Sequence, residues 1–220
     1  MSELEQILQG MFVALSIDPV QQRTLTENLE KIKHKDQATY EHSIRVALLG
    51  VKVARNMNLN PKPLFYSGLL HDIGKILVDK ELLAKKGVFD EEDRKKMKKH
   101  PEYAYYLIKD MHDFTAEIIV RHHRSQKDPY PEELPPTNKS YPLNKKLCIG
   151  LYARILSLVD FYDAITTRNN GKYGAEKLTP KQRKKIVLES YPDQAELIEK
   201  LYADNVFDNV QDDSGCQKDL

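Results

Sequence analysis

The chain has 220 residues, of which 40% are hydrophobic and 30% charged, and its formal net charge is +1. This length predicts one well-packed domain with a small helical appendage, and the balanced charge argues against binding to nucleic acid polymers or anionic membranes. The two cysteines, Cys148 and Cys216, lie far apart, which argues against a disulfide framework and favours a reducing, cytoplasmic location.

The sequence shows no targeting or membrane-spanning segment. The first residues, MSELEQILQGMFVAL, lack the basic start and long apolar run of a signal peptide. The most apolar window, 147–165, is interrupted by Arg154, Asp160 and Asp163, so it indicates a buried helix rather than a membrane span.

Apolar residues recur mostly at helical spacing, without sustained period-two alternation, and this pattern predicts an all-α fold. Asp18 followed by Pro19 is typical of a helix N-cap and first helical position. The predicted helices, in chain order, are 4–13, 19–32, 37–57, 61–74, two short helices capped by Asp79 and Asp90, a helix broken or restarted at Pro101, one capped by Asp113 and ending at 121–123, 146–167, one opened by Thr179 and Pro180, and 193–205.

One long proline-rich stretch, residues 124–144, interrupts these helices. A loop of this length within a compact domain is either a functional lid or binding loop, or a disordered insertion. We therefore divide the chain into an N-terminal helical extension (1–33), a main domain (34–175), C-terminal helices packed on it (176–206) and a disordered tail (207–220).

Five of the seven histidines and two aspartates form the candidate site: His42, His71, Asp72, His100, His122, His123 and Asp160. A buried carboxylate needs a partner or a metal ion, and Asp160 lies in an apolar-patterned helix. Imidazole and carboxylate ligands suit iron, manganese, zinc, cobalt or nickel. The set exceeds what one ion needs and suits two ions sharing a carboxylate and a hydroxide. Any single histidine would more often be structural, and His34 and His112 are predicted to be surface residues.

The segments that carry these residues resemble the HD-domain superfamily of metal-dependent phosphohydrolases, and its HD-GYP branch most closely. They are YEHSIRVALLGVKVA, LLHDIGKILVDKELLAKKG, MKKHPEYAYYLI, IIVRHHR and ARILSLVDFYDAITTR. The resemblance covers about residues 36–170. It implies an HD-domain helical bundle with short N- and C-terminal helical extensions, and hydrolysis of cyclic di-GMP by iron or manganese ions.

Carried over by position, the resemblance also implies ligand roles. It makes His42, His71, Asp72 and Asp160 the basic ligand set, whereas His100, His122 and His123 complete a second ion. Asp72 would bridge the two ions, and Asp72 with Lys75 would be the catalytic residues.

The chain departs from the family pattern in its substrate loop. Ala38 stands where some members have a glutamate that holds a third ion, so we expect two ions. The family's HHExxDGxGYP stretch appears as HHRSQKDPYP, with Arg124 in place of the glutamate and Pro129 displacing the glycine. Tyr130 and Pro131 are retained.

Five residues are candidate substrate contacts, each with a plainer alternative. Lys75, one turn after the His-Asp pair, either binds a non-bridging phosphate oxygen or is a surface lysine at a helix end. Asp163 either orients a ligand histidine, contacts substrate, or is a surface acid. Arg124 and Arg168 either bind phosphate or are solvated, and Tyr130 either stacks on a base or packs internally.

We predict a phosphodiesterase that cleaves a cyclic dinucleotide with a two-metal-activated hydroxide. One alternative is an HD-type hydrolase of another nucleotide or phosphate ester, and another is a non-catalytic nucleotide-sensing module. The expected partner is a small nucleotide. The N-terminal helices either pack on the bundle or form a homodimer contact through Ile7, Leu8, Met11 and Phe12.

Overall fold

The computed structural model describes residues 2–85, 87–137, 139–167 and 178–207. All regular structure within these ranges is helical, which confirms the predicted all-α class. The elements are α1 (Glu3–Ala14), α2 (Pro19–Lys35), α3 (Gln37–Asn56), α4 (Lys62–Leu70), the 3-10 helix η1 (Ile73–Leu77), α5 (Lys80–Leu83), α6 (Glu91–Met97), α7 (His100–Ile108), α8 (Asp113–Ile119), α9 (Leu143–Thr167), α10 (Pro180–Ser190), the 3-10 helix η2 (Pro192–Gln194) and α11 (Ala195–Ala203).

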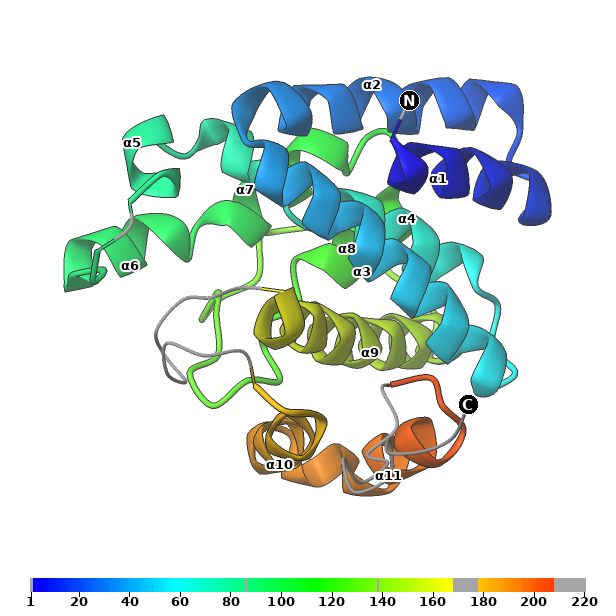
Figure 1. The fold of residues 1–220 in the computed structure, drawn as a ribbon. Helices are drawn as coiled ribbons and strands as arrows, with labels where there is room; N and C mark the ends of the chain where they lie inside the picture. The colour runs from blue at the N-terminus through cyan, green and yellow to red at the C-terminus, as the bar shows by residue number, and fades with distance from the viewer. Residues whose placement is uncertain (1, 86, 138, 168–177, 208–220) are drawn as a thin grey trace, which may run out of the picture.

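Helices α3 and α9 form the middle of the molecule (Figure 1). Helices α1 and α2 cover one side of this pair, α10 and α11 lie on the opposite side, and α5 and α6 project as an arm. Helix α3 packs against α2, α4 and α9, whereas η1 packs against α7. None of the helices in the described ranges combines the length and apolarity that crossing a membrane requires.

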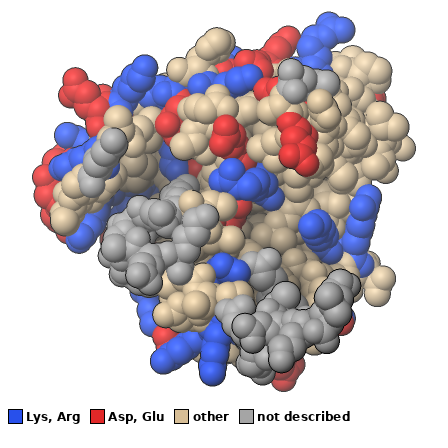
Figure 2. Space-filling model, viewed as in Figure 1, with Lys and Arg blue, Asp and Glu red and all other residues tan. Residues whose placement is uncertain are grey.

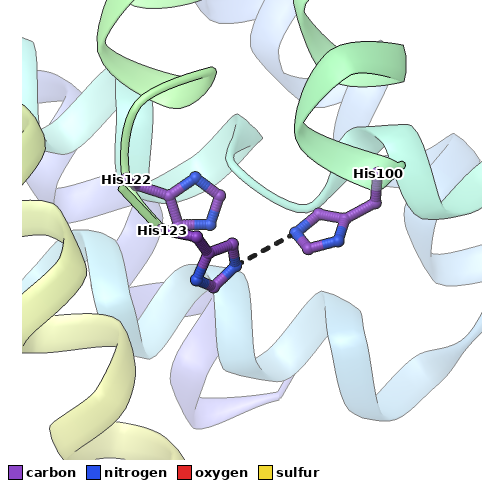
Figure 3. A group of neighbouring side chains, drawn as sticks. All are labelled: His100, His122 and His123. Atoms are coloured by element: carbon purple, nitrogen blue, oxygen red, sulfur yellow. Dashed lines mark hydrogen bonds between the residues drawn. The ribbon is translucent and has the colours of Figure 1, made fainter. Parts of the chain in front are cut away.

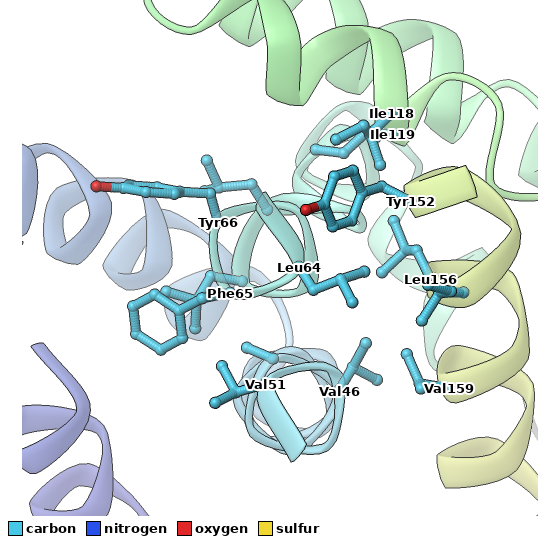
Figure 4. Close-up of a cluster of buried hydrophobic side chains, with 14 of the residues drawn as sticks. Val46, Val51, Leu64, Phe65, Tyr66, Ile118, Ile119, Tyr152, Leu156 and Val159 are labelled. Carbon is cyan, nitrogen blue, oxygen red and sulfur yellow. The ribbon is translucent and has the colours of Figure 1, made fainter. Parts of the chain in front are cut away.

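The core lies where α3, α4, α8 and α9 meet (Figure 4). Val46 of α3, Leu64 of α4 and Val159 of α9 are all fully buried there. Burying one such side chain contributes about 1.5–3 kcal/mol to stability. On the face shown in Figure 2, basic side chains are interspersed with acidic ones, in line with the net charge of +1.

Capping residues explain where several helices begin. The carboxylate of Asp18 accepts hydrogen bonds from the backbone amides of Val20 and Gln21, so the predicted start of α2 is confirmed. Asp90 and Thr179 each form a capping box, at the starts of α6 and α10. Local side-chain chemistry of this kind is readable from sequence.

Some predicted helix boundaries were wrong. The N-cap of α8 is His112 rather than Asp113, because the His112 ring accepts a hydrogen bond from the Thr115 amide at 3.3 Å. His112 is half-buried and stacks on Tyr66, so it is not the surface residue that was expected. Asp193 lies within η2, and α11 begins after it. The helix predicted over 61–74 ends at residue 70, where the chain tightens into η1.

The terminal helices share the central core. Leu8 and Phe12 are buried, and the Phe12 ring meets Phe65 of α4 edge-on, with centroids 5.7 Å apart. These two residues are therefore used inside the chain and are not free for a homodimer contact. At the other end, Phe207 is buried and stacks on Tyr162, so the packed chain extends one residue into the predicted tail. Residues 208–220 of that tail lie outside the described residues.

Two glycines allow helices that carry site residues to approach closely. A Cβ atom on Gly68 of α4 would lie 2.5 Å from the Cα atom of Ala47 in α3. A Cβ atom on Gly74 of η1 would overlap the carbonyl oxygen of His100 and lie 2.7 Å from the Ala104 amide nitrogen. The atoms that the added Cβ would meet belong to the backbone, so they cannot move aside without a large cost in packing energy.

We expect Gly74→Ala to lower the free energy of unfolding by about 1–3 kcal/mol, because the added methyl group overpacks the contact between η1 and α7. Chemical denaturation monitored by circular dichroism measures this change. The control is Gly150→Ala in α9, where a Cβ atom meets nothing within 4 Å, and where alanine should stabilise the helix by about 0.5–1 kcal/mol. Equal denaturation midpoints for the two variants would contradict the expectation.

Candidate metal centre

Residues from five segments of the chain converge at the middle of the bundle, and none of them is more than 8% exposed. They are His42 in α3, His71 at the end of α4, Asp72 between α4 and η1, His100 at the start of α7, His122 and His123 after α8, and Asp160 in α9. All seven candidates named from the sequence are thus brought together.

The first group of side chains is His42, His71 and Asp160, whose ligand atoms lie within 4.8 Å of one another. The Nε2 atom of His42 is 2.9 Å from Asp160 Oδ1, and the Nε2 atom of His71 is 3.7 Å from the same oxygen. Ligand atoms bound to one ion at about 2.1 Å lie roughly 3 to 3.5 Å apart, so these separations fit a shared cation.

The second group is His100, His122 and His123, and its ligand atoms also lie within 4.8 Å of one another. Figure 3 shows the three imidazole rings turned toward one another, with His100 coming from a different segment than the adjacent pair. The Nε2 atoms of His100 and His123 are 3.3 Å apart. Three neutral imidazoles facing one point form a typical nitrogen ligand set for a transition metal.

Asp72 lies between the two groups. Its Oδ1 atom is 3.3 Å from His100 Nε2, and its Oδ2 atom is 3.4 Å from His71 Nε2. One carboxylate therefore turns one oxygen toward each group. This is the arrangement that a bridging carboxylate between two cations requires.

Backbone carbonyls orient three of the histidines. The Nδ1 atom of each donates a hydrogen bond to the carbonyl oxygen three residues earlier: His71 to Gly68 at 2.9 Å, His100 to Met97 at 2.9 Å, and His122 to Ile119 at 2.5 Å. With the proton on Nδ1, the Nε2 atom keeps a lone pair directed at the centre.

Several buried imidazole nitrogens of these two groups are left without a hydrogen bond. Among the described residues, the buried atoms without a partner include Nε2 of His71, Nε2 of His122 and Nδ1 of His123. A buried polar atom without a partner costs about 1–3 kcal/mol. Finding three within one small space indicates that a cation belongs among them, so the residues fit a metal centre.

The electrostatics favour neutral forms of the second histidine group and ionised carboxylates in the centre, whereas Asp72 and Asp160 outweigh the effect of burial on His71 and raise its pKa. Burial lowers the pKa of His100 to about 3 and that of His122 to about 4, so both rings are neutral near pH 7. Burial alone would raise the pKa of Asp72, but Lys75 and the neighbouring histidines hold it well below its usual range. Neutral imidazole and carboxylate are the forms that bind metal ions.

A carboxylate and an arginine support His42 from behind. The Nδ1 atom of His42 donates to Asp163 Oδ2 at 2.7 Å, and Asp163 is only 6% exposed. Of its three predicted roles, the structure places Asp163 in the first, orienting a histidine, and not at the surface. The guanidinium of Arg45 donates to both oxygens of Asp163, at 2.9 and 3.1 Å. Arg45 was missed from the sequence, although its position one helical turn after His42 was a usable signal.

The remaining predicted substrate contacts have different positions in the structure. The Nζ atom of Lys75 is 2.6 Å from Asp72 Oδ2, so Lys75 is not a surface lysine. Tyr130 stacks on His123, with ring centroids 4.4 Å apart. Arg124 is exposed and does not line the cleft, in line with the solvated alternative, and its guanidinium donates to the backbone carbonyls of Pro131 and Glu132, both at 3.0 Å. Arg168 lies outside the described residues.

The centre opens into a cleft of about 680 Å³. Its floor contains ligand side chains, including His42, Asp72 and Asp160. Its walls carry mostly apolar or aromatic side chains together with a few polar ones: Leu83, Phe89, Met97, Phe161, Ala164, Tyr130, Thr39 and Gln126. This volume lies within the range of about 300–1,000 Å³ that small-molecule sites occupy.

Comparison with known proteins gives consistent results. A family model described as the HD domain matches residues 39–165. The chain is 31% identical over 154 residues to a cyclic di-GMP phosphodiesterase of Pseudomonas aeruginosa, an alignment that covers 67% of this chain and 35% of the relative. It is 30% identical over 138 residues to 3'3'-cGAMP-specific phosphodiesterase 1 of Vibrio cholerae, covering 60% of this chain and 30% of the relative. The chain thus spans about a third of the length of these relatives.

Solved structures share the fold. The crystal structure of the HD domain of the L. monocytogenes phosphodiesterase PgpH matches with a TM-score of 0.59 at 17% identity, covering 81% of this chain and 94% of that one. The same domain in complex with cyclic di-AMP matches with a TM-score of 0.58 at 18% identity and the same coverage. At these identities the likeness concerns the fold.

Proposed function

The chain belongs to the HD domain family, and on this premise we propose that it hydrolyses a phosphodiester bond of a cyclic dinucleotide at a centre of two divalent metal ions. The observation that carries the proposal is the position of Asp72, with one oxygen facing each of the two ligand groups. Two adjacent cations held by one carboxylate are suited to phosphoryl chemistry, because they stabilise both the attacking and the leaving oxygen.

The ligand assignment corresponds to the two groups. His42, His71 and Asp160 would hold one ion, His100, His122 and His123 would hold the other, and Asp72 would contribute one oxygen to each. Ala38 lines the cleft and has no ligand atom, which supports two ions rather than three. Iron or manganese is the expected metal from the family resemblance, and the nitrogen and oxygen ligands also accept zinc, cobalt or nickel.

The protein's own residues then position the reacting group. Bound divalent ions supply Lewis acidity and lower the pKa of water toward neutrality. Lys75 lines the cleft beside Asp72 and donates a charge-assisted hydrogen bond to a non-bridging phosphate oxygen. Asp163 keeps the proton on His42 Nδ1, and Tyr130 covers one face of the His123 ring. Together these contacts keep the site ordered before substrate arrives.

The cleft supports a nucleotide as substrate. Phe89 and Met97 come from the arm formed by α5 and α6, and Phe161 comes from α9. All three are half-buried, so each keeps exposed apolar surface on which a base can stack. The two phosphodiesterases from Pseudomonas and Vibrio act on cyclic di-GMP and on 3'3'-cGAMP, which favours a cyclic dinucleotide.

A second candidate is an HD-type hydrolase of another nucleotide or phosphate ester. The observation that favours it is the loop after the ligand pair, where Arg124 is tied to the backbone of Pro131 and Glu132. A loop closed in this way differs from the family's glycine-containing one and presents another surface to substrate. A purely sensory module is less well supported, because all seven ligand side chains are in place.

We expect the protein, purified anaerobically with iron or manganese supplied, to hold about two ions per chain and to cleave a cyclic dinucleotide. Elemental analysis measures the metal, and chromatography of reactions with cyclic di-GMP, 3'3'-cGAMP, cyclic di-AMP and cyclic mononucleotides identifies the substrate. Asp72→Ala should lose metal and turnover together, because both ions share this carboxylate. Fewer than one ion per wild-type chain would contradict the centre. Cleavage of mononucleotides alone would favour the second candidate.

Replacing Lys75 by methionine should lower kcat/KM for the phosphodiester by about 100- to 1,000-fold while leaving the metal content near that of the wild type. The physical reason is the loss of a cation next to the phosphate oxygens. Initial-rate kinetics with parallel elemental analysis tests this. Lys80→Met, an exposed residue of α5, is the matched control and should behave as wild type. Unchanged rates for Lys75→Met would remove Lys75 from the mechanism.

Asp163→Asn should weaken metal binding by about 10- to 100-fold, because the neutral amide no longer holds the His42 proton with a charge-assisted bond. Competition with a coloured chelator gives the affinity directly. Asp110→Asn provides the control, since the Asp110 side chain is 90% exposed. Identical affinities for both variants would show that Asp163 does not support the centre.

A further inference from the structure

Arg45 has a hydrogen-bonding group that its contacts with the described residues leave unused. Its Nε and Nη2 atoms donate to Asp163, and Nη2 also lies 3.5 Å from the Thr167 hydroxyl. Within the described part of the chain, its remaining nitrogen, Nη1, has no hydrogen-bond partner. The side chain is 33% exposed and lines the cleft. Because two of its nitrogens are fixed by Asp163, the third is held in place with little freedom left to lose on binding.

The charges in the cleft make this group stand out. Among the described lining residues, Lys75 and Arg45 are the only lysine or arginine. Two acids also line the cleft beyond the metal centre: Asp36 accepts hydrogen bonds from Thr39, and Glu41 accepts one from Gln37. An anionic ligand that extends past the metal centre therefore meets acids unless it is directed to Arg45.

His42 lies between Lys75 and Arg45, the two basic side chains of the cleft. Its Nδ1 edge faces Asp163, which Arg45 holds, whereas its Nε2 atom lies 3.9 Å from the Asp72 oxygen that Lys75 contacts. Lys75 and Arg45 thus flank the metal centre on opposite sides of one imidazole. A phosphate bound at the ions beside Lys75 leaves Arg45 free for a second anionic group of the same molecule.

A cyclic dinucleotide carries such a group, because its ring contains two phosphates of which one reacts at a time. We propose that Arg45 binds the second, non-reacting phosphate and so selects substrates with two phosphates in one ring. This inference rests on the proposed phosphodiesterase function and adds a determinant of specificity to it. An arginine held by a carboxylate on one edge binds phosphate through the other with a charge-assisted hydrogen bond.

The test compares a substrate with two phosphates and a substrate with one. The metal-loaded wild type and Arg45→Gln are assayed with cyclic di-GMP, 3'3'-cGAMP, cyclic di-AMP and bis(p-nitrophenyl) phosphate, a diester with a single phosphate. Dissociation constants for the same cyclic dinucleotides are measured by calorimetry, and metal content by elemental analysis. Arg55→Gln, an exposed arginine near the end of the same helix, is the charge-matched control.

We expect Arg45→Gln to lower the ratio of kcat/KM for the cyclic dinucleotide to kcat/KM for the single-phosphate diester by about 10- to 100-fold. The dissociation constant for the cyclic dinucleotide should rise by a similar factor, whereas Arg55→Gln should leave both unchanged. Arg45→Lys is the second variant, in case the glutamine disturbs Asp163. Its ammonium can still pair with Asp163 but has no fixed third group, so the same ratio should fall while metal is retained.

A constant ratio in both Arg45 variants, with both substrates losing rate in parallel with metal content, would overturn the inference and leave Arg45 as a support for Asp163 alone. A wild type that cleaves the single-phosphate diester but neither binds nor cleaves any cyclic dinucleotide would instead refute the proposed substrate. The two failures are thereby distinguishable.

Discussion

The structure depends on how a helical bundle tolerates a polar centre. Five imidazoles and two carboxylates occupy space that aliphatic side chains would otherwise fill, and none is more than 8% exposed. Unpaired groups of this kind destabilise a fold strongly, and here several inward-facing nitrogens have no hydrogen bond among the described residues. Bound cations would resolve the conflict, because they would accept lone pairs from these nitrogens and balance the carboxylates. The centre that weakens the bare chain therefore becomes a source of stability when ions bind, which links metal binding to folding.

Close backbone contact makes this convergence geometrically feasible. Most ligands lie at helix ends or in the turns beside them, where the chain changes direction and a side chain can reach inward. Gly74 lets η1 lie directly against the start of α7, so Asp72 comes within 3.3 Å of His100. Gly68 does the same for α4 and α3. The bundle thus brings together residues separated by more than a hundred positions, such as His42 of α3 and Asp160 of α9, by packing its helices against one another.

Much of this arrangement was predictable from sequence, for definable physical reasons. Helix starts at Asp18 and Thr179 were readable because capping is a local interaction between neighbouring residues. The ligand set was recognisable because several metal-binding residue types occur together in a known order. Arg45 and the backbone contacts of Arg124 were not predicted, since both depend on partners that only folding brings near. His112 was misjudged for the same reason, because the polar residues around it in sequence are not its neighbours in space.

The hydrogen bond from each of three imidazoles to a carbonyl three residues earlier has an evolutionary consequence. Each of these three histidines is oriented by a carbonyl group within its own turn of the chain. The direction of its ring therefore does not depend on loops further along the chain. The ring orientation of these three histidines is therefore insensitive to changes in the loop after His123, whereas Tyr130 of that loop stacks on the His123 ring. A scaffold of this kind can change the loop beside the substrate cleft while the orientation of these three histidines stays the same.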